Sequence, residues 1–305
     1  MRNPEKGAHD FAAPRLQRNW DWRAAANFIG GGAGGGLLLC ASVAGFSAPA
    51  TRTALLLGML LVACGLTCVW FEIGRPWRAA NVYRHIATSW MTREAVVSLL
   101  LFATGAWALY SLQTPFVTLA GLLGLVYLYS QARMLAANKG IPAWRHPRCV
   151  PLMMACSLAE GAGFLACVAA AWGVIGAWAG VCLLVVVAVR AIGWKRYLGG
   201  LVADGAPEGS IKVLTGVDLR FVMFGHGLPA LLALPALFGL MGAQVSVFAA
   251  GLILVASGWA IKFTLVRRAA FTQGTALPRL PVRGRGVGGP EAKPGWAPVP
   301  RAHSG

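Results

Sequence analysis

The densest group of chemically active side chains lies between two apolar runs, in residues 71–95 (FEIGRPWRAANVYRHIATSWMTREA). This stretch holds four arginines, two glutamates, two tryptophans and a histidine. Carboxylates and imidazoles accept and release protons, whereas arginine and tryptophan N–H groups donate hydrogen bonds to carbonyl oxygens. The mixture suits proton-coupled chemistry on a ligand that carries carbonyl groups. Whether these side chains act together depends on the helices that position them.

The composition of the chain indicates a membrane protein. Of its 305 residues, 57% are hydrophobic and only 12% are charged, whereas a soluble domain carries about 25% charged residues. A helix needs roughly 20 mostly apolar residues to span a bilayer, and its backbone groups must be satisfied within the segment. We therefore predict an all-α integral membrane protein with eight transmembrane helices, at about 24–45, 53–73, 94–112, 115–131, 150–172, 174–194, 220–242 and 245–266.

The distribution of charge predicts the topology. The net charge is +17, and nearly all Lys and Arg lie in the two tails and in the loops after the second, fourth and sixth helices. The other loops hold only Arg52. Because basic residues stay on the cytoplasmic side, we expect a multi-pass protein of the bacterial inner membrane with both termini cytoplasmic. This distribution explains the charge without a nucleic-acid partner.

Three regions follow from this topology. Residues 1–23 form a cytoplasmic tail, and 24–266 form the membrane domain. Residues 267–305 form a basic tail rich in Pro and Gly, which we expect to be disordered.

Cysteine and histidine patterns argue against a metal centre in this chain. None of the seven cysteines forms a C-x-x-C pair, and nearly all lie inside predicted spans. We therefore expect neither an iron–sulfur cluster nor a zinc site. Only His226 of the five histidines lies at a span, whereas a haem b held from both sides needs two. Any electrons handled by this chain must then travel on a diffusing organic carrier, with the metals in a partner.

The glycine run at 30–36 (GGGAGGG) resembles a phosphate loop only superficially. No Lys-Ser/Thr pair follows it, and no strand precedes it. Its small-x-x-x-small pairs instead predict close helix packing.

Glu160 lies near the middle of the fifth predicted helix, where an acidic residue costs roughly 2.5–3.5 kcal/mol on insertion scales. It is a candidate for a proton relay or a ligand carboxyl. A structural hydrogen bond to a neighbouring helix explains it equally well.

The 71–95 stretch matches the needs of a quinone site at the cytoplasmic end of the second and third helices. A quinone head group has two carbonyl oxygens that need donors, and quinol oxidation releases protons that a carboxylate can accept. Its isoprenoid tail must enter from lipid, which places the site at a span end. The side chains that can supply these parts are Glu72, Arg75, Arg78, Trp90 and Glu94.

Other polar residues approach the same side of the membrane. Asn27 on the first helix either lines a cavity or makes an interhelical bond. Tyr127 and Gln131 are four residues apart and share one face of the fourth helix. Arg93 lies at the interface, and His226, near the start of the seventh helix, is either a proton carrier or a donor to a backbone carbonyl.

The 71–95 stretch also resembles the segment between the second and third helices of the dimethyl sulfoxide reductase membrane-anchor (DmsC-like) family. That family shows Gly-x-Pro, Ala and Asn along the loop, and then Ser-x-x-Ser/Thr-Arg-Glu. Residues 131–147 (QARMLAANKGIPAWRHP) are similar to it as well. The resemblance implies a haem-free anchor that binds menaquinone or ubiquinone and docks a four-cluster iron–sulfur subunit, which contacts a molybdopterin catalytic subunit. The broader polysulfide-reductase-type anchors imply two four-helix bundles.

The resemblance also implies roles for two residues. The quinol-linked glutamate of the Arg-Glu motif matches Glu94, and a family histidine falls where this chain has Glu72. The sequence pattern Glu-x-Gly-Arg-Pro-Trp-Arg is similar to one in the anchors of phenylacetyl-CoA:acceptor oxidoreductase, in which electrons flow toward the quinone. Two other classes stay open: a proton-coupled secondary transporter that uses Glu160, and an assembly protein without a ligand.

Overall fold

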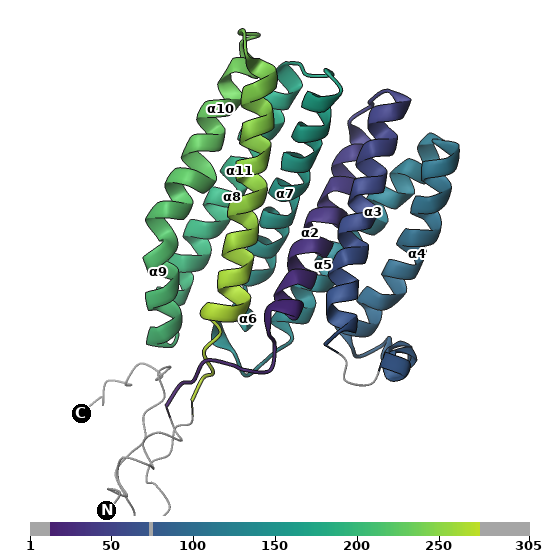
Figure 1. Cartoon of the computed structure of the whole chain (residues 1–305). Helices are drawn as coiled ribbons and strands as arrows, with labels where there is room; N and C mark the ends of the chain where they lie inside the picture. The colour runs from purple at the N-terminus through teal and green to yellow at the C-terminus, as the bar shows by residue number, and fades with distance from the viewer. Residues whose placement is uncertain (1–12, 73–75, 275–305) are drawn as a thin grey trace, which may run out of the picture.

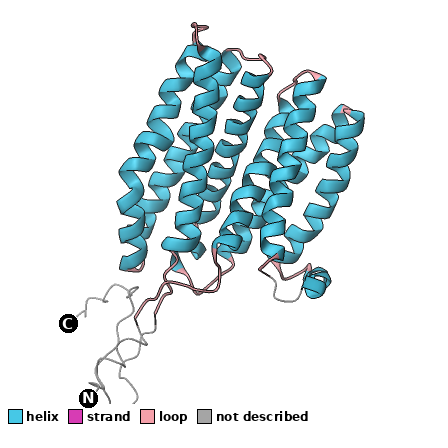
Figure 2. Ribbon diagram, viewed as in Figure 1, coloured by secondary structure: helices cyan, strands magenta, loops and turns pink. Residues whose placement is uncertain are grey.

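The computed structural model describes residues 13–72 and 76–274, and for 76–80 it describes the backbone alone. The described chain is helical apart from loops and one isolated bridge (Figures 1 and 2). The first four long helices are α2 (Trp22–Val43), α3 (Ala48–Trp70), α4 (Trp90–Ser111) and α5 (Thr114–Ala136). The later ones are α7 (Cys149–Ala171), α8 (Ala177–Ala203), α9 (Glu208–Val222), α10 (Leu228–Leu237) and α11 (Ala243–Phe263). Short segments are the 3₁₀ helix η1 (Pro76–His85), α6 (Pro142–Arg145), and the π-helical η2 (Met223–Gly227) and η3 (Thr264–Arg268).

Eight helical spans in the described chain are long and apolar enough to cross a membrane, which confirms the predicted fold class. The seventh span comprises α9, η2 and α10, and the eighth comprises α11 and η3. α8 continues to Ala203 although its apolar run ends at 194, because Tyr197 and Leu201 on its other face are buried. The seventh span likewise begins at Glu208, earlier than predicted. Hydropathy marks the apolar segment, whereas burial of one face decides where the helix ends.

The spans form two groups that lie side by side (Figure 1). α2, α3, α4 and α5 make the first bundle, and α7, α8, α9–η2–α10 and α11 make the second. α2 also packs against α7, so that it joins the two bundles.

The glycines of α2 explain its central position, as the small-x-x-x-small pattern predicts. A Cβ atom on Gly34 would lie only 2.5 Å from the Gly58 carbonyl oxygen of α3. One on Gly35 would lie 2.7 Å from the Gly124 carbonyl oxygen of α5, and one on Gly36 would overlap the Ser157 backbone of α7. Each glycine pair therefore brings α2 against a different helix at backbone distance.

The two ends of the described chain meet at one end of the bundles. Leu16 and Phe271 form an antiparallel bridge, and the Gln17 amide donates to the Ala270 carbonyl at 2.9 Å. The loops that follow α3, α5 and α8 lie at this same end (Figure 1). Most basic residues of the described chain therefore gather at one end, as the charge pattern predicts, whereas Arg52 lies at the other end.

At that end, His146 gives the fold a dependence on pH. It is buried, its Nε2 lies 3.2 Å from an Asp204 carboxylate oxygen, and its Nδ1 accepts from the Arg148 amide at 3.1 Å. Burial lowers the pKa of His146, and the attraction of Asp204 opposes this change. The unfolded chain consequently binds more protons than the folded protein just below the ordinary histidine pKa, so stability falls as the pH drops through about 6.5.

We expect His146→Gln to flatten this acid-side loss. The measurement is the midpoint of thermal unfolding in detergent between about pH 5 and 8, the range around the ordinary histidine pKa. His85→Gln is the matched control, because His85 is exposed. An unchanged pH profile in His146→Gln would contradict this account.

Candidate functional site

Glu94 lies on the interior face of α4, close to its start. Ser89 caps the helix by accepting a hydrogen bond from the Thr92 amide at 3.3 Å. The Glu94 side chain is buried between helices of the first bundle. Asn27 Nδ2 of α2 donates to Glu94 Oε1 at 3.1 Å, and Gln131 Nε2 of α5 donates to the same oxygen at 3.0 Å.

Three helices thus converge on one carboxyl group. Gln131 Nε2 also lies 3.0 Å from the Asn27 carbonyl oxygen and 3.4 Å from the Tyr127 hydroxyl oxygen. Tyr127 is buried and reaches the group through this contact with Gln131. We call Asn27, Glu94, Tyr127 and Gln131 the Glu94 cluster. The sequence singles out each member separately, and the packing of α2, α4 and α5 brings them together.

One atom of the Glu94 cluster is left without a partner. Asn27 Oδ1 is buried and accepts no hydrogen bond from the described residues. A buried polar atom of this kind calls for a ligand or a water molecule. Asn27 therefore makes an interhelical bond through Nδ2, and its Oδ1 atom can still accept a hydrogen bond.

Trp90 and Arg93 lie beside the Glu94 cluster, and Arg93 binds the loop that precedes α4. The Arg93 guanidinium lies 4.3 Å from the centroid of the half-buried Trp90 ring, and that of Arg133 lies 5.1 Å from it. Arg93 also donates to the carbonyls of Ile86 and Ala87, at 3.0 and 2.7 Å. No described contact joins either side chain to the Glu94 carboxyl.

The other arginines predicted for the site cannot be placed on it. Arg75 and the side chain of Arg78 lie outside the described residues.

The structure separates Glu72 from Glu94. Glu72 follows the end of α3, next to the start of α2, where Arg23 Nη1 donates to the Phe71 carbonyl at 2.6 Å. Partial burial raises the pKa of Glu72, and the negative charge of Asp21 adds to the effect. No described contact links Glu72 to the Glu94 cluster. The two carboxyls predicted for one site therefore lie in different surroundings.

Comparison with known families supports the anchor resemblance. Residues 50–155 match the family model of the DMSO reductase anchor subunit (DmsC). The DmsC match runs from α3 into α7 and includes Glu94, Tyr127 and Gln131. No curated protein matches the chain. The eight apolar spans show a multi-pass membrane protein, and residues 50–155 of it are similar to the DMSO reductase anchor subunit family. The DmsC match does not support the resemblance to anchors of phenylacetyl-CoA:acceptor oxidoreductase.

Most of the second bundle lies beyond the DmsC match and holds a buried ion pair. Glu160 of α7 lies 2.7 Å from Lys262 Nζ of α11, and both side chains are fully buried. Lys262 Nζ also donates to Ser157 Oγ at 2.9 Å and to the Phe28 carbonyl of α2 at 3.1 Å. Sequence reasoning missed Lys262 because a single lysine at the end of an apolar run is normally expected to reach the interface.

A buried arginine lies near this ion pair. Arg190 of α8 is fully buried and donates to the Leu254 carbonyl at 3.0 Å, to Ser257 Oγ at 3.2 Å and to the Gly225 carbonyl. His226 packs edge-on against the Phe221 ring, with the centroids 4.6 Å apart. Neither His226 nitrogen makes a hydrogen bond of normal geometry with the described residues.

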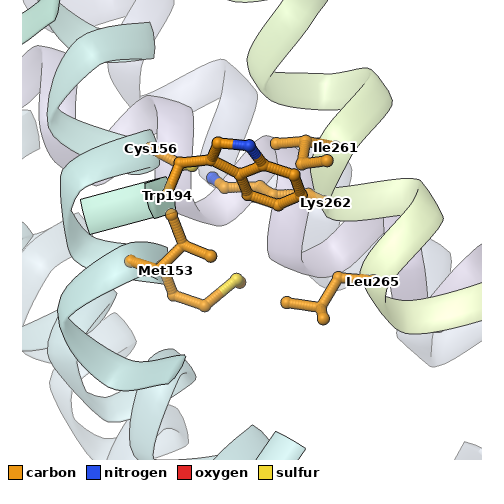
Figure 3. A pocket seen from close by; sticks show the side chains of 7 residues that line it. Met153, Cys156, Trp194, Ile261, Lys262 and Leu265 are labelled. Atoms are coloured by element: carbon orange, nitrogen blue, oxygen red, sulfur yellow. The ribbon is translucent and has the colours of Figure 1, made fainter. Parts of the chain in front are cut away.

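A narrow gap that leaves no room for a water molecule adjoins Lys262 (Figure 3). Its lining is apolar except for Lys262, and it includes Met153, Trp194 and Leu265. Within the described residues, no group of three or more His, Cys, Asp or Glu side chains is arranged to hold a metal ion.

Proposed function

We propose that this chain is the haem-free anchor subunit of a molybdopterin/iron–sulfur oxidoreductase. In that role it exchanges electrons between membrane menaquinone or ubiquinone and a docked four-cluster iron–sulfur subunit. The observation that supports this proposal is the buried Glu94 cluster, because its carboxyl lies inside the DmsC match and carries convergent hydrogen-bond donors. The basic end of the bundles favours both termini in the cytoplasm and a location in the bacterial inner membrane.

The residues of the Glu94 cluster fit a quinone head group. Oxidation of a bound quinol releases two electrons, which pass to the docked iron–sulfur subunit, and two protons, which Glu94 accepts one at a time and passes on to water. Asn27 Oδ1, which has no partner, can accept a hydrogen bond from a hydroxyl group. α3 and α4 also expose large apolar side chains along which an isoprenoid tail can lie, and these include Leu56, Leu60, Leu99 and Leu100.

Each residue then has a definite task. The Glu94 carboxylate takes up a proton, and the Asn27 and Gln131 amides orient it for that step by donating to Oε1. Tyr127 keeps water away from one side of it, since its ring is buried. This chain supplies the proton acceptor and the binding surface, whereas the metal centres belong to the partners.

A binding measurement tests this proposal on the chain itself. We expect the purified full-length protein in detergent to bind a short-tail quinone saturably, with quenching of tryptophan fluorescence. Gln131→Leu should raise the Kd by about 10-fold or more, because Glu94 then loses an orienting donor whose hydrogen bond to the charged carboxylate contributes about 1.5–3 kcal/mol.

Gln244→Leu is the matched control for this measurement. It removes a side-chain bond of 2.7 Å to the Ala170 carbonyl in the second bundle. Absence of saturable quinone binding by the wild-type chain would refute the proposal. Equal losses in both variants would show that the Glu94 cluster is not the binding site.

A further inference from the structure

α2 separates two buried carboxyl groups, one in each bundle. On the side of the first bundle, Asn27 and Gln131 hold Glu94. On the side of the second bundle, Lys262 holds Glu160 and also reaches α2. The points of contact on α2 are two consecutive carbonyl oxygens. Gln131 Nε2 lies 3.0 Å from the Asn27 oxygen, and Lys262 Nζ lies 3.1 Å from the Phe28 oxygen.

Two neighbouring glycines make room for these donors. In an α-helix, the carbonyls of residues 27 and 28 already accept from the amides of Gly31 and Gly32. Each carbonyl oxygen has a second lone pair, which a side chain reaches only if no Cβ atom stands in the way. A Cβ atom on Gly31 would overlap Gln131 Nε2, and one on Gly32 would overlap Lys262 Nζ. Both donors therefore depend on glycine at these positions.

At Gly31 and Gly32, α2 has no side chain of its own that fixes its rotation. A glycine face packs closely but presents no side chain that can interlock with a neighbouring helix. Gly31 and Gly32 are separated by one residue step, or about 100° around the helix. Gln131 and Lys262 therefore hold α2 from two adjacent faces, and the rotation they fix decides whether Asn27 points at Glu94.

We propose that Gly32, Lys262 and Glu160 are positioning residues for the Glu94 cluster and act on it through α2. The ion pair of the second bundle thereby sets the affinity of the first bundle for the quinone, and in this respect the inference rests on the proposed function. Lys262 contacts no member of the Glu94 cluster through its side chain. Its effect passes through the Phe28 carbonyl and the adjacent Asn27.

Two variants remove the Lys262 contact by different routes. Gly32→Ala displaces the ammonium group from α2, whereas the double variant Glu160→Gln/Lys262→Met removes the donor together with the negative charge that pairs with it. We expect both to raise the Kd for a short-tail quinone about 3- to 30-fold, the range of coupling between linked sites. Unchanged Kd values in both would overturn the inference.

Gly36→Ala is the packing control. Gly36 lies on the same face one turn later, and its Cβ would meet the Ser157 backbone rather than a polar side chain. We expect it to lower the unfolding midpoint while the Kd stays within about twofold, as for independent sites. An increase in Kd equal to that of Gly32→Ala would show that loose packing alone explains the effect.

A second measurement does not depend on the quinone. The shift in unfolding midpoint caused by Glu94→Gln is compared in the wild-type and Gly32→Ala backgrounds. Coupled sites give different shifts in the two backgrounds, whereas equal shifts would overturn the inference. If the wild-type chain bound no quinone but the shifts differed, the proposed function would fail and the coupling through α2 would stand.

Discussion

Glu94→Gln is expected to reduce quinone-linked turnover of the assembled complex by about 100-fold, the lower end of the contribution of a positioned acid or base. Glutamine keeps the size of the side chain and still accepts hydrogen bonds from Asn27 and Gln131. It cannot take up a proton at neutral pH. The loss should therefore fall on the proton-coupled step, with the helices of the first bundle in place.

The assay compares two electron carriers on the same preparation. Turnover with a quinone should fall, whereas reaction of the soluble subunits with a water-soluble dye should stay at the wild-type rate. Glu72→Gln is an informative comparison. Glu72 follows α3, lies next to the start of α2, and makes no described contact with the Glu94 cluster. Normal quinone turnover in Glu94→Gln would remove this carboxyl from the mechanism, and a parallel loss with the dye would indicate general damage.

The fold was predictable because its signals are local. An apolar run of about 20 residues is visible without any tertiary contact, and all eight spans follow from such runs. The glycine pairs of α2 likewise predict close packing, although the sequence does not say which helix each pair meets. That choice depends on how α2 is rotated within the two bundles.

The candidate site was predictable only in its parts. Asn27, Glu94 and Gln131 each stand out as polar residues in apolar surroundings, but their meeting depends on which helices are neighbours. Glu72 and Glu94 are joined by one short stretch of sequence, yet Glu72 faces the start of α2. Closeness along the chain is a weak guide where a loop turns between helices.

The buried cations escaped sequence analysis for a physical reason. Averaging over an apolar run hides a single Arg190 or Lys262, and long basic side chains near helix ends usually extend to the interface. Lys262 instead turns inward because Gly32 leaves room for its ammonium group, and the Phe28 carbonyl, Ser157 Oγ and the Glu160 carboxylate offer it three acceptors. The sequence marks Glu160 as a buried acid, but only the packing of α7 against α11 shows that Lys262 is its partner.

Lys262→Met should lower the free energy of unfolding by about 3–5 kcal/mol, because it leaves the Glu160 carboxylate buried and unpaired. The remaining oxygen of that carboxylate, Oε1, already lacks a hydrogen-bond partner. Adding Glu160→Gln should recover most of the loss, since an uncharged pair of similar volume is often as stable as a buried ion pair. The rescue separates the charge effect from simple loss of packing.

Lys195→Met provides the matched control for this prediction. Lys195 pairs with Asp218 at 3.1 Å, but its side chain is 60% exposed. An exposed pair contributes at most about 1 kcal/mol, so the unfolding midpoint should move little. Denaturant or thermal unfolding in detergent measures all four proteins under one condition. If Lys262→Met were as stable as Lys195→Met, or if the double variant were no better than the single one, the buried pair would not hold α7 and α11 together in the way the structure indicates.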